Sequence, residues 1–463
     1  MKLRELTVCV LSVGLAYACH QDAHASLRIE PDAREADAAM VSDATRDAFS
    51  LPLPVLTREQ RTRFFLGNSF FNQNWVSAPA STAERDGLGP LFNARSCSTC
   101  HFKDGRGRAP DAGADMQTML LRVSIPGLTE HGAPKPHPIY GDQIQHLSVQ
   151  GLDAEARVVV DYDEHVETLP DGEVYVLRAP RIQLVDEHYG SASAPLLISA
   201  RIAPALVGMG LLEAVPEREV LAHADADDRN HDGVSGRANR VWDVVSQTSR
   251  LGRFGWKAEQ PDLQQQTAGA FLGDMGITSA LFPEENCTPS QTVCASLPSG
   301  GAPEIAADTL ESVVRYVRTL AVPAPRALAP ELAAHGAELF EHARCGLCHL
   351  TTLHTESVPH VPELTSVAFH AYTDLLLHDL GPGLADARPS FAADGREFRT
   401  APLWGLGLVE KVNGQLSLLN DGRARTFGEA VLWHGGEAEP AKQAFIALSR
   451  ADRSALLAFV AAL

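Results

Sequence analysis

Two short stretches, Cys97-Ser98-Thr99-Cys100-His101 and Cys345-Gly346-Leu347-Cys348-His349, carry the same Cys-x-x-Cys-His pattern. This pattern marks covalent attachment of haem c. Two thiols one helical turn apart can add across the two haem vinyl groups, and the histidine that follows then lies under the iron as its proximal ligand. A redox dithiol would need neither the histidine nor a second copy, and a zinc site would leave both histidines unexplained. The sequence therefore predicts two covalently bound haems, held by Cys97, Cys100 and His101 and by Cys345, Cys348 and His349.

The other four cysteines lie outside these motifs. Cys9 falls inside an N-terminal export signal, and Cys19 lies at its boundary. Cys287 and Cys294 bracket a short loop, and in an oxidising compartment such a pair predicts a local disulfide. We expect no catalytic thiol in this pair.

The N-terminus has the layout of a bacterial export signal. Two basic residues precede an apolar stretch from Leu6 to Leu15, which is too short to span a bilayer, and two Ala-x-Ala cleavage patterns follow. Ala18-Cys19 also resembles a lipoprotein cleavage site, in which case a lipid on Cys19 would be the one link to a membrane. We expect a signal peptide over residues 1–25, a disordered tether over residues 26–56, and a periplasmic or otherwise exported protein.

The acidic composition argues against one class of partner. Of the 463 residues, 58 are acidic and 39 are Lys or Arg, which gives a formal net charge of −19. An acidic chain without a basic block is repelled by phosphate backbones, so we expect no nucleic-acid binding. A hydrophobic content of 45% is ordinary for a globular protein.

Hydrophobic periodicity predicts a mainly α fold with two cytochrome c-like haem domains. The first domain is expected over residues 57–322 and the second over residues 328–463, with two prolines between them. A Phe-rich helix should open the first domain. The stretch Asp308-Thr309-Leu310-Glu311 should cap its last helix, and Ser449 and Asp452 should cap the helix that ends the chain.

A β-rich region is expected inside the first domain, at about residues 131–200. The stretches 156–160 and 173–177 are rich in Val, and the turn signal Pro170-Asp171-Gly172 separates them. This pattern predicts a small hairpin or sheet inserted in a helical protein.

An acidic loop within residues 225–239 suggests a hard cation such as Ca²⁺. Asp228, Asn230 and Asp232 place oxygen atoms at alternate positions ahead of a glycine turn. A complete EF-hand would need Glu at the twelfth position from Asp228, where this chain has Asn239. The sequence leaves open a looser calcium loop and an acidic, solvated turn.

Further motifs between Phe64 and the C-terminus resemble those of one family. They are Gly208-Met209-Gly210-Leu211-Leu212-Glu213, Asp232-Gly233-Val234-Ser235-Gly236-Arg237, Gly252-Arg253-Phe254-Gly255-Trp256-Lys257, Leu376-Leu377-His378-Asp379, Arg399-Thr400-Ala401-Pro402-Leu403-Trp404-Gly405, Asp421-Gly422-Arg423-Ala424-Arg425 and Trp433-His434-Gly435-Gly436-Glu437. With the two haem motifs, they resemble the di-haem oxidoreductases also called thiol oxidoreductase-like proteins, distant relatives of the bacterial di-haem cytochrome c peroxidases. The resemblance implies an oxidoreductase with two haems.

The resemblance also implies ligands for the second haem. Residues 429–435 are similar to a peroxidase helix Glu-Ala-Val-x-x-Met-Gly, whose methionine ligates the C-terminal haem, and His434 takes that place here. Bis-histidine ligation should lower the potential, because Met/His ligation raises it. A loop histidine bonded to a haem propionate is the alternative for His434. His378 is the other candidate distal ligand, and its alternative is a helix-end histidine.

This chain departs from the family pattern at two positions. Leu380 stands where a methionine usually follows the His-Asp pair, and Asn420 stands where a histidine usually precedes Asp-Gly-Arg. The second departure puts peroxidase activity in question if that histidine moves protons or electrons.

These observations predict an exported di-haem c-type oxidoreductase that reduces hydrogen peroxide with electrons from a small periplasmic cytochrome or cupredoxin. By analogy, the second haem receives electrons and the first reacts. Glu437 is the candidate acid/base residue, and a solvated carboxylate is its alternative. Two other functions stay open, an electron-transfer cytochrome with two six-coordinate haems and a haem enzyme that modifies another protein.

Overall fold

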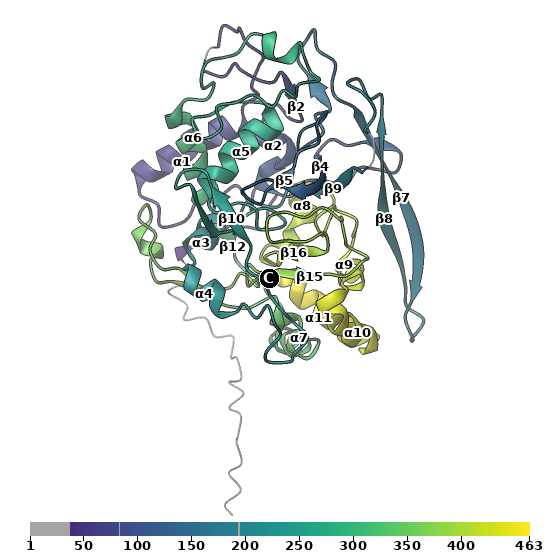
Figure 1. Cartoon of the computed structure of the whole chain (residues 1–463). Coiled ribbons are helices and arrows are strands. Elements are labelled where there is room, and N and C mark those ends of the chain that lie inside the picture. The colour runs from purple at the N-terminus through teal and green to yellow at the C-terminus, as the bar shows by residue number, and fades with distance from the viewer. Residues whose placement is uncertain (1–37, 83, 193–194) are drawn as a thin grey trace, which may run out of the picture.

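The computed structural model describes residues 38–82, 84–192 and 195–463, and helices and small sheets alternate along the chain (Figure 1). Helices make up 29% of the chain and strands 19%, spread over several small sheets. The mainly α fold expected from the sequence is therefore wrong. Some strands pair across long stretches of sequence, as Met119 does with Ile202, and local periodicity does not reveal such pairs. The predicted signal peptide, with Cys9 and Cys19, lies outside the described residues.

A helical layer supports the first Cys-x-x-Cys-His motif. Its helices are α1 (Arg58–Asn72), α2 (Cys97–Cys100), α5 (Leu263–Met275) and α6 (Ala307–Arg318). α1 and α6 approach closely at Gly67, where a side chain would collide with the backbone of Ser312. Phe71 of α1 packs on Tyr316 of α6 with ring centroids 5.3 Å apart. The motif helix α2 packs against α1, so this crossing fixes its position.

The β region is larger than predicted. It contains β3 (Ala114–Asp115), β4 (Met119–Leu128), β5 (Pro134–Lys135), β6 (Leu147–Ser148), β7 (Arg157–Thr168), β8 (Val174–Val185) and β9 (Leu197–Ile202). Two three-stranded sheets have the orders β5-β4-β9 and β3-β7-β8, and β6 pairs with β2 (Leu91–Phe92). The hairpin expected around residues 170–172 is present, with strands of 12 residues each. We call this β7–β8 hairpin, residues 157–185, the arm.

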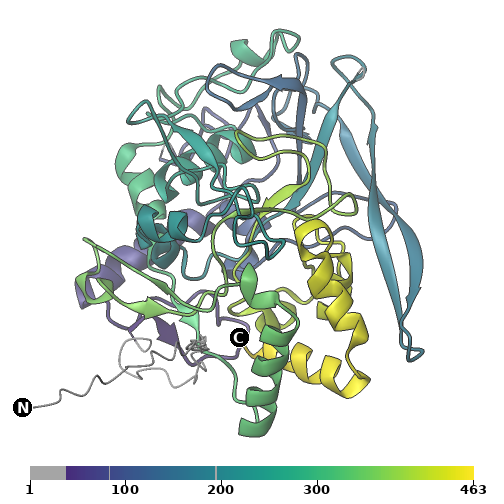
Figure 2. The same cartoon turned by 60° about the horizontal axis from the view of Figure 1, so that its bottom comes forward.

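The arm reaches the C-terminal helices. These are α7 (Pro330–His342), α9 (Phe427–Trp433), α10 (Glu439–Ala447) and α11 (Arg450–Ala462). In Figures 1 and 2 the arm lies alongside the yellow C-terminal part of the chain. α7 and α11 cross at Gly336, where a Cβ would lie 2.5 Å from that of Phe459. The predicted cap of the last helix is confirmed, because the Ser449 side chain accepts from the Asp452 amide.

Short elements complete the fold. They are β1 (Met40–Val41), α3 (Met209–Ala214), α4 (Glu217–Ala222), β10 (Arg240–Asp243), β11 (Thr248–Leu251), β12 (Val322–Pro323), β13 (Leu353–His354), β14 (Ala368–Phe369), β15 (Leu377–Asp379), β16 (Glu397–Arg399) and α8 (Val409–Asn413). Among the described residues, no helix is both long and apolar enough to cross a membrane.

Two local expectations differ from the structure. Residues 38–56, predicted as part of the tether, pack against the body: β1 pairs with β12, and Phe49 is 1% exposed. Apolar side chains such as Phe49 and Leu53 anchor this segment. The expected cap of α6 does not form, because the helix starts at Ala307 and makes no side-chain cap bond.

The predicted disulfide between Cys287 and Cys294 is confirmed. Within the loop that it closes, Gln291 donates from Nε2 to Oε1 of buried Glu155, at 2.5 Å. The loop is thereby attached to the β region.

Candidate functional site

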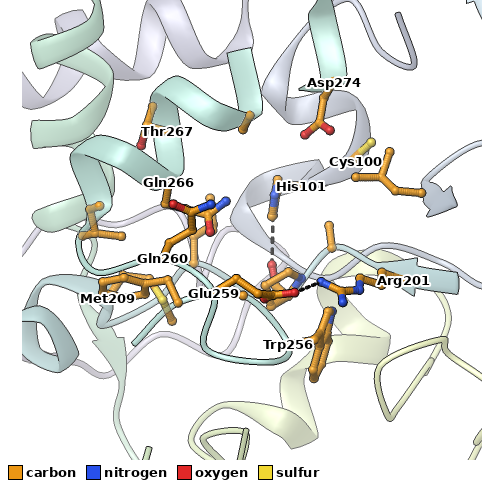
Figure 3. Close-up of a pocket in the computed structure, with 18 of the residues that line it drawn as sticks. Cys100, His101, Arg201, Met209, Trp256, Glu259, Gln260, Gln266, Thr267 and Asp274 are labelled. Carbon is orange, nitrogen blue, oxygen red and sulfur yellow. Dashed lines mark hydrogen bonds and ion pairs between the residues drawn. The ribbon is translucent and has the colours of Figure 1, made fainter. Parts of the chain in front are cut away.

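The first motif lines a cavity of about 550 Å³. Figure 3 shows His101 in this cavity, with Cys100 beside it. The Nδ1–H of His101 donates to the carbonyl oxygen of Pro204 at 2.9 Å. Burial lowers the pKa of His101 to about 4, so the ring is neutral near pH 7. Because Nδ1 carries the proton, Nε2 keeps its lone pair for a metal ion.

The second motif lines a separate cavity of about 200 Å³. Here the Nδ1–H of His349 donates to the carbonyl oxygen of Tyr372, again at 2.9 Å. Burial lowers the pKa of His349 to about 4. Both motif histidines are therefore oriented in the same way, although the helices that support them differ.

The thiols do not have the properties of a redox dithiol. Burial, with a smaller effect of Asp274, raises the pKa of Cys97 to about 12, and burial raises the pKa of Cys345 to about 12. Reactive Cys-x-x-Cys thiols have a lowered pKa instead. The two pairs line different cavities, so they do not form one zinc site.

The first cavity is rich in arginine. Its lining includes Arg106, Arg122, Arg201, Arg388 and Arg399. Arg122 pairs with Asp142 and Arg201 with Glu259, whereas the other three donate to backbone carbonyls. Burial lowers the pKa of each of these three arginines to about 10.

Two of the arginines that line this cavity each have a guanidinium nitrogen without a hydrogen-bond acceptor in the described part of the chain. Nη2 of Arg201 and Nε of Arg388 are buried without a hydrogen-bond partner in the described part of the chain. Buried donors are normally satisfied, and haem propionates are anionic acceptors that would satisfy them. The thiols, the oriented histidine and these donors together fit a haem group.

His434 lies in the second cavity with His349. It follows the last residue of α9, and its Nδ1–H donates to the carbonyl oxygen of Ala430 at 2.7 Å. Burial lowers the pKa of His434, so this ring is also neutral. Its Nε2 is available as a ligand, as is that of His349.

His378 has different contacts. Its Nε2 bonds Oδ2 of Asp374 at 2.8 Å and its Nδ1 bonds Oε2 of Glu437 at 2.7 Å. These contacts raise the pKa of His378 despite its burial, Asp374 contributing most. The ring is a cation between two carboxylates, and its Nδ1 lies 3.6 Å from Cys348 Sγ. Neither nitrogen has a free lone pair for iron in this arrangement.

Glu437 is held firmly as an anion. Besides His378, its carboxylate accepts from the Ser235 amide at 2.9 Å, the Ser235 hydroxyl at 2.6 Å and the Asp379 amide at 3.1 Å. These donors lower its pKa to about 2, although burial opposes them. Glu437 therefore links residues far apart in the sequence and has no proton to give near pH 7.

The candidate calcium residues bond within their own loop. Asp228 accepts from the Gly233 amide, Asn230 from the Asp232 amide, and Asp232 from the Val234 amide. Within residues 38–82, 84–192 and 195–463, no group of three or more His, Cys, Asp or Glu side chains is placed to hold a metal ion. The loop instead covers the second cavity, which Val234 lines.

Three large side chains line both cavities: Arg106, Trp256 and Arg399. Trp256 donates from Nε1 to the carbonyl oxygen of Ile202 at 2.8 Å, and the Arg106 guanidinium lies 5.2 Å from its ring centroid. Sequence reasoning quoted Trp256 in a family motif but assigned it no role. The two sites are therefore separated by one shared wall.

Asp274 was also missed. It lies near the end of α5 and lines the first cavity (Figure 3), and its Oδ1 accepts from Nε2 of Gln143 at 3.0 Å. Burial raises the pKa of Asp274, against the effect of Arg122. The sequence feature that could have identified Asp274 is an acidic residue in the apolar second half of a helix.

The two residues that depart from the family pattern, Leu380 and Asn420, both line the second cavity.

The chain has two neighbouring cavities, each with a Cys-x-x-Cys-His motif and an oriented histidine. This arrangement is that of a di-haem protein. Residues 35–463 match the family described as "Di-haem oxidoreductase, putative peroxidase", and the chain belongs to this family, as its motifs indicated. Membership implies haem cofactors and oxidoreductase chemistry.

Other comparisons add little. No curated protein matches the chain. Hydrazine synthase of Kuenenia stuttgartiensis, in a structure pressurized with 20 bar xenon, is 13% identical; the match covers 99% of this chain and 100% of that one, with a TM-score of 0.31. This similarity is too low to bear on the fold or the function.

Proposed function

We propose that this protein is a di-haem c-type oxidoreductase that reduces hydrogen peroxide. Cys97, Cys100 and His101 would hold the first haem, and Cys345, Cys348 and His349 the second. The observation that carries the proposal is the contrast between the cavities. The second contains two neutral histidines with available Nε2 atoms, whereas the first is larger and is lined by Asp274 and by five arginines, against three arginines in the second.

The residues divide the chemistry between the two cavities. Peroxide reduction consumes two electrons and two protons and yields two water molecules. When bound, haem supplies an iron that exchanges single electrons and can bind peroxide. Asp274, whose pKa is raised by burial, is the proposed proton-transfer group of the first cavity, whereas Glu437, whose pKa is lowered to about 2, is a positioning residue. His434 would be the second histidine ligand of the haem in the second cavity, and Trp256 and Arg106 line both cavities.

The electron donor is proposed to be a small periplasmic cytochrome or cupredoxin. The net charge of −19 favours a basic donor, because opposite charges speed encounter. The export signal supports the same compartment, with a lipid on Cys19 as a further option. Calcium forms no part of this proposal.

A second function, electron transfer without peroxide chemistry, is favoured by one observation. Met209 lines the first cavity and could supply a sixth ligand there. The two functions differ in whether the first haem keeps an open coordination site.

Spectroscopy of the purified holoprotein tests the proposal. A pyridine haemochrome assay should give two haems c per chain, and electron paramagnetic resonance should show one high-spin and one bis-histidine low-spin haem. Peroxide should be consumed when a reduced donor is supplied. Two low-spin haems and no peroxide consumption would establish the electron-transfer function instead.

A further inference from the structure

The arm crosses from the first half of the chain to the helix that precedes His434. We propose that the arm positions His434, so that a hairpin from one haem region controls ligation in the other. This inference rests on the proposed role of His434 as a ligand. It assigns a function to the β region, which the haem chemistry itself does not use.

The helix before His434 depends on its neighbours. α9 has 7 residues, and a helix this short is not stable on its own in water. His434 ends it with extended backbone (φ −62°, ψ 134°), and two glycines follow. The direction of the imidazole is thus set by what packs against α9, which is the arm on one side and α10 and α11 on the other.

Apolar contacts connect the arm to α9. Tyr175 of β8 lies over Gly428, where an added Cβ would be 2.5 Å from the tyrosine ring. Leu177, which is 3% exposed, and Leu169 belong to the same buried cluster as Leu432 of α9. Any shift of the arm would therefore open a gap beneath α9 or push into it.

Polar contacts fix the N-terminal end of α9. Nη2 of Arg425 donates to the carbonyl oxygen of Val176 at 2.5 Å. The Glu429 carboxylate, in the first turn of α9, accepts from the Arg425 amide at 2.8 Å. Arg178 donates to the carbonyl oxygen of Arg423 at 3.1 Å. The segment that leads into α9 is therefore bound to β8 along its edge.

The tip of the arm is anchored separately. Asp171 and Glu173 pair with Arg453 of α11, whose side chain is only 2% exposed. At the other end of α9, the rings of His165 and Trp433 meet edge to face, with centroids 5.5 Å apart. The arm thus holds α9 at its start, its middle and the residue before His434.

The opposite face of the arm provides a matched control. Val166 and Val174 are 65% and 56% exposed, and both lie on the hairpin that carries the contact residues. Replacing either one by Ala removes apolar atoms from the arm without touching α9.

The experiment measures exchange of the His434 ligand in the di-haem holoprotein. Imidazole is added to the ferric protein, and binding at the second haem is followed by optical and electron paramagnetic resonance spectra. Tyr175→Ala and Leu177→Ala should raise the apparent affinity for imidazole, or the high-spin fraction of the second haem, by about tenfold. Val166→Ala and Val174→Ala should match the wild type, and signals of the first haem should not change in any variant.

Four outcomes would overturn the inference. The first is an unchanged second-haem spectrum in both contact variants. The second is an equal change at both haems, which would indicate general loosening. If a contact variant does not fold, Glu173→Gln, which weakens the tip anchor, must show the same change in the second haem, and the absence of that change is the third outcome. His434→Ala is measured in the same series; if it leaves the second haem low-spin, the proposed ligation is wrong and the inference falls with it.

Discussion

The two cavities contain the same five-residue motif but differ in volume and in the residues that line them. Around the first, five arginines and Asp274 line a space of about 550 Å³. Around the second, mostly apolar side chains, His434 and three arginines enclose about 200 Å³, and two of those arginines, Arg106 and Arg399, also line the first cavity. Because the motif histidines have the same hydrogen-bond geometry, the proposed difference in reactivity would come from the other residues that line the cavities.

Removing either motif has the largest expected effect. Cys97→Ala with Cys100→Ala should leave one haem per chain and reduce peroxide consumption to background, because the reactive cavity loses its cofactor. Cys345→Ala with Cys348→Ala should also leave one haem, but the remaining haem should still bind cyanide. The measurements are a pyridine haemochrome count and a cyanide titration. If the first pair retained peroxide consumption and the second pair lost cyanide binding, the roles of the cavities would be reversed.

Replacing Asp274 tests the proton chemistry of the first cavity. Asp274→Asn keeps the size of the side chain and removes the carboxyl group that could transfer a proton, so peroxide turnover should fall about 100-fold, the lower range for a general acid. Glu437→Gln is the control, since Glu437 is already ionised and touches the other cavity. Equal losses in both variants would mean that Asp274 acts through structure alone.

The sequence was sufficient for features whose chemistry is local. The haem motifs, the disulfide and the hairpin turn each lie within a few residues, and the structure contains the Cys287–Cys294 bond and the hairpin. The contacts that define the site are not local. Ser235 and His378 meet at Glu437 from 202 and 59 positions away. No rule of sequence spacing predicts these contacts. From the sequence alone, Glu437 was therefore predicted to be an acid/base residue and His378 a candidate haem ligand.

The prediction of a mainly α fold was wrong for a related reason. Helical periodicity around the motifs was real, but strand pairs such as Met119 with Ile202 depend on distant partners. The predicted tether was wrong for a different reason, since part of a segment predicted to be disordered packs against the body of the protein. Residues 38–56 contain several apolar side chains, and buried ones such as Phe49 and Leu53 anchor the segment.

His434→Met makes the second cavity more like a high-potential site. Methionine at this position should raise the reduction potential of the second haem, because Met/His ligation is the high-potential arrangement. A redox titration with optical detection measures the change, and the first haem should keep its own potential. A potential that stays constant would mean that another residue occupies the sixth position.

The smallest expected effect concerns the anion that joins the two halves of the chain. Glu437→Gln breaks a buried pair with His378 and should lower the free energy of unfolding by about 1–3 kcal/mol. The pKa of Glu437 is lowered from 4.5 to about 2, so its contribution is complete above pH 4.5 and disappears as the pH falls toward 2. The pKa of His378 is raised above 6.5, so its contribution is complete below that pH and is lost only as the pH rises through the folded-state value. The stability difference between wild type and variant, measured by denaturant unfolding, should therefore be largest between about pH 4.5 and 6.5 and shrink on acidification.

A stability difference that grew toward pH 3 would mean that Glu437 is protonated in the folded protein. The proposed contrast between Asp274 as a proton-transfer group in the first cavity and Glu437 as an anion at the second would then be wrong.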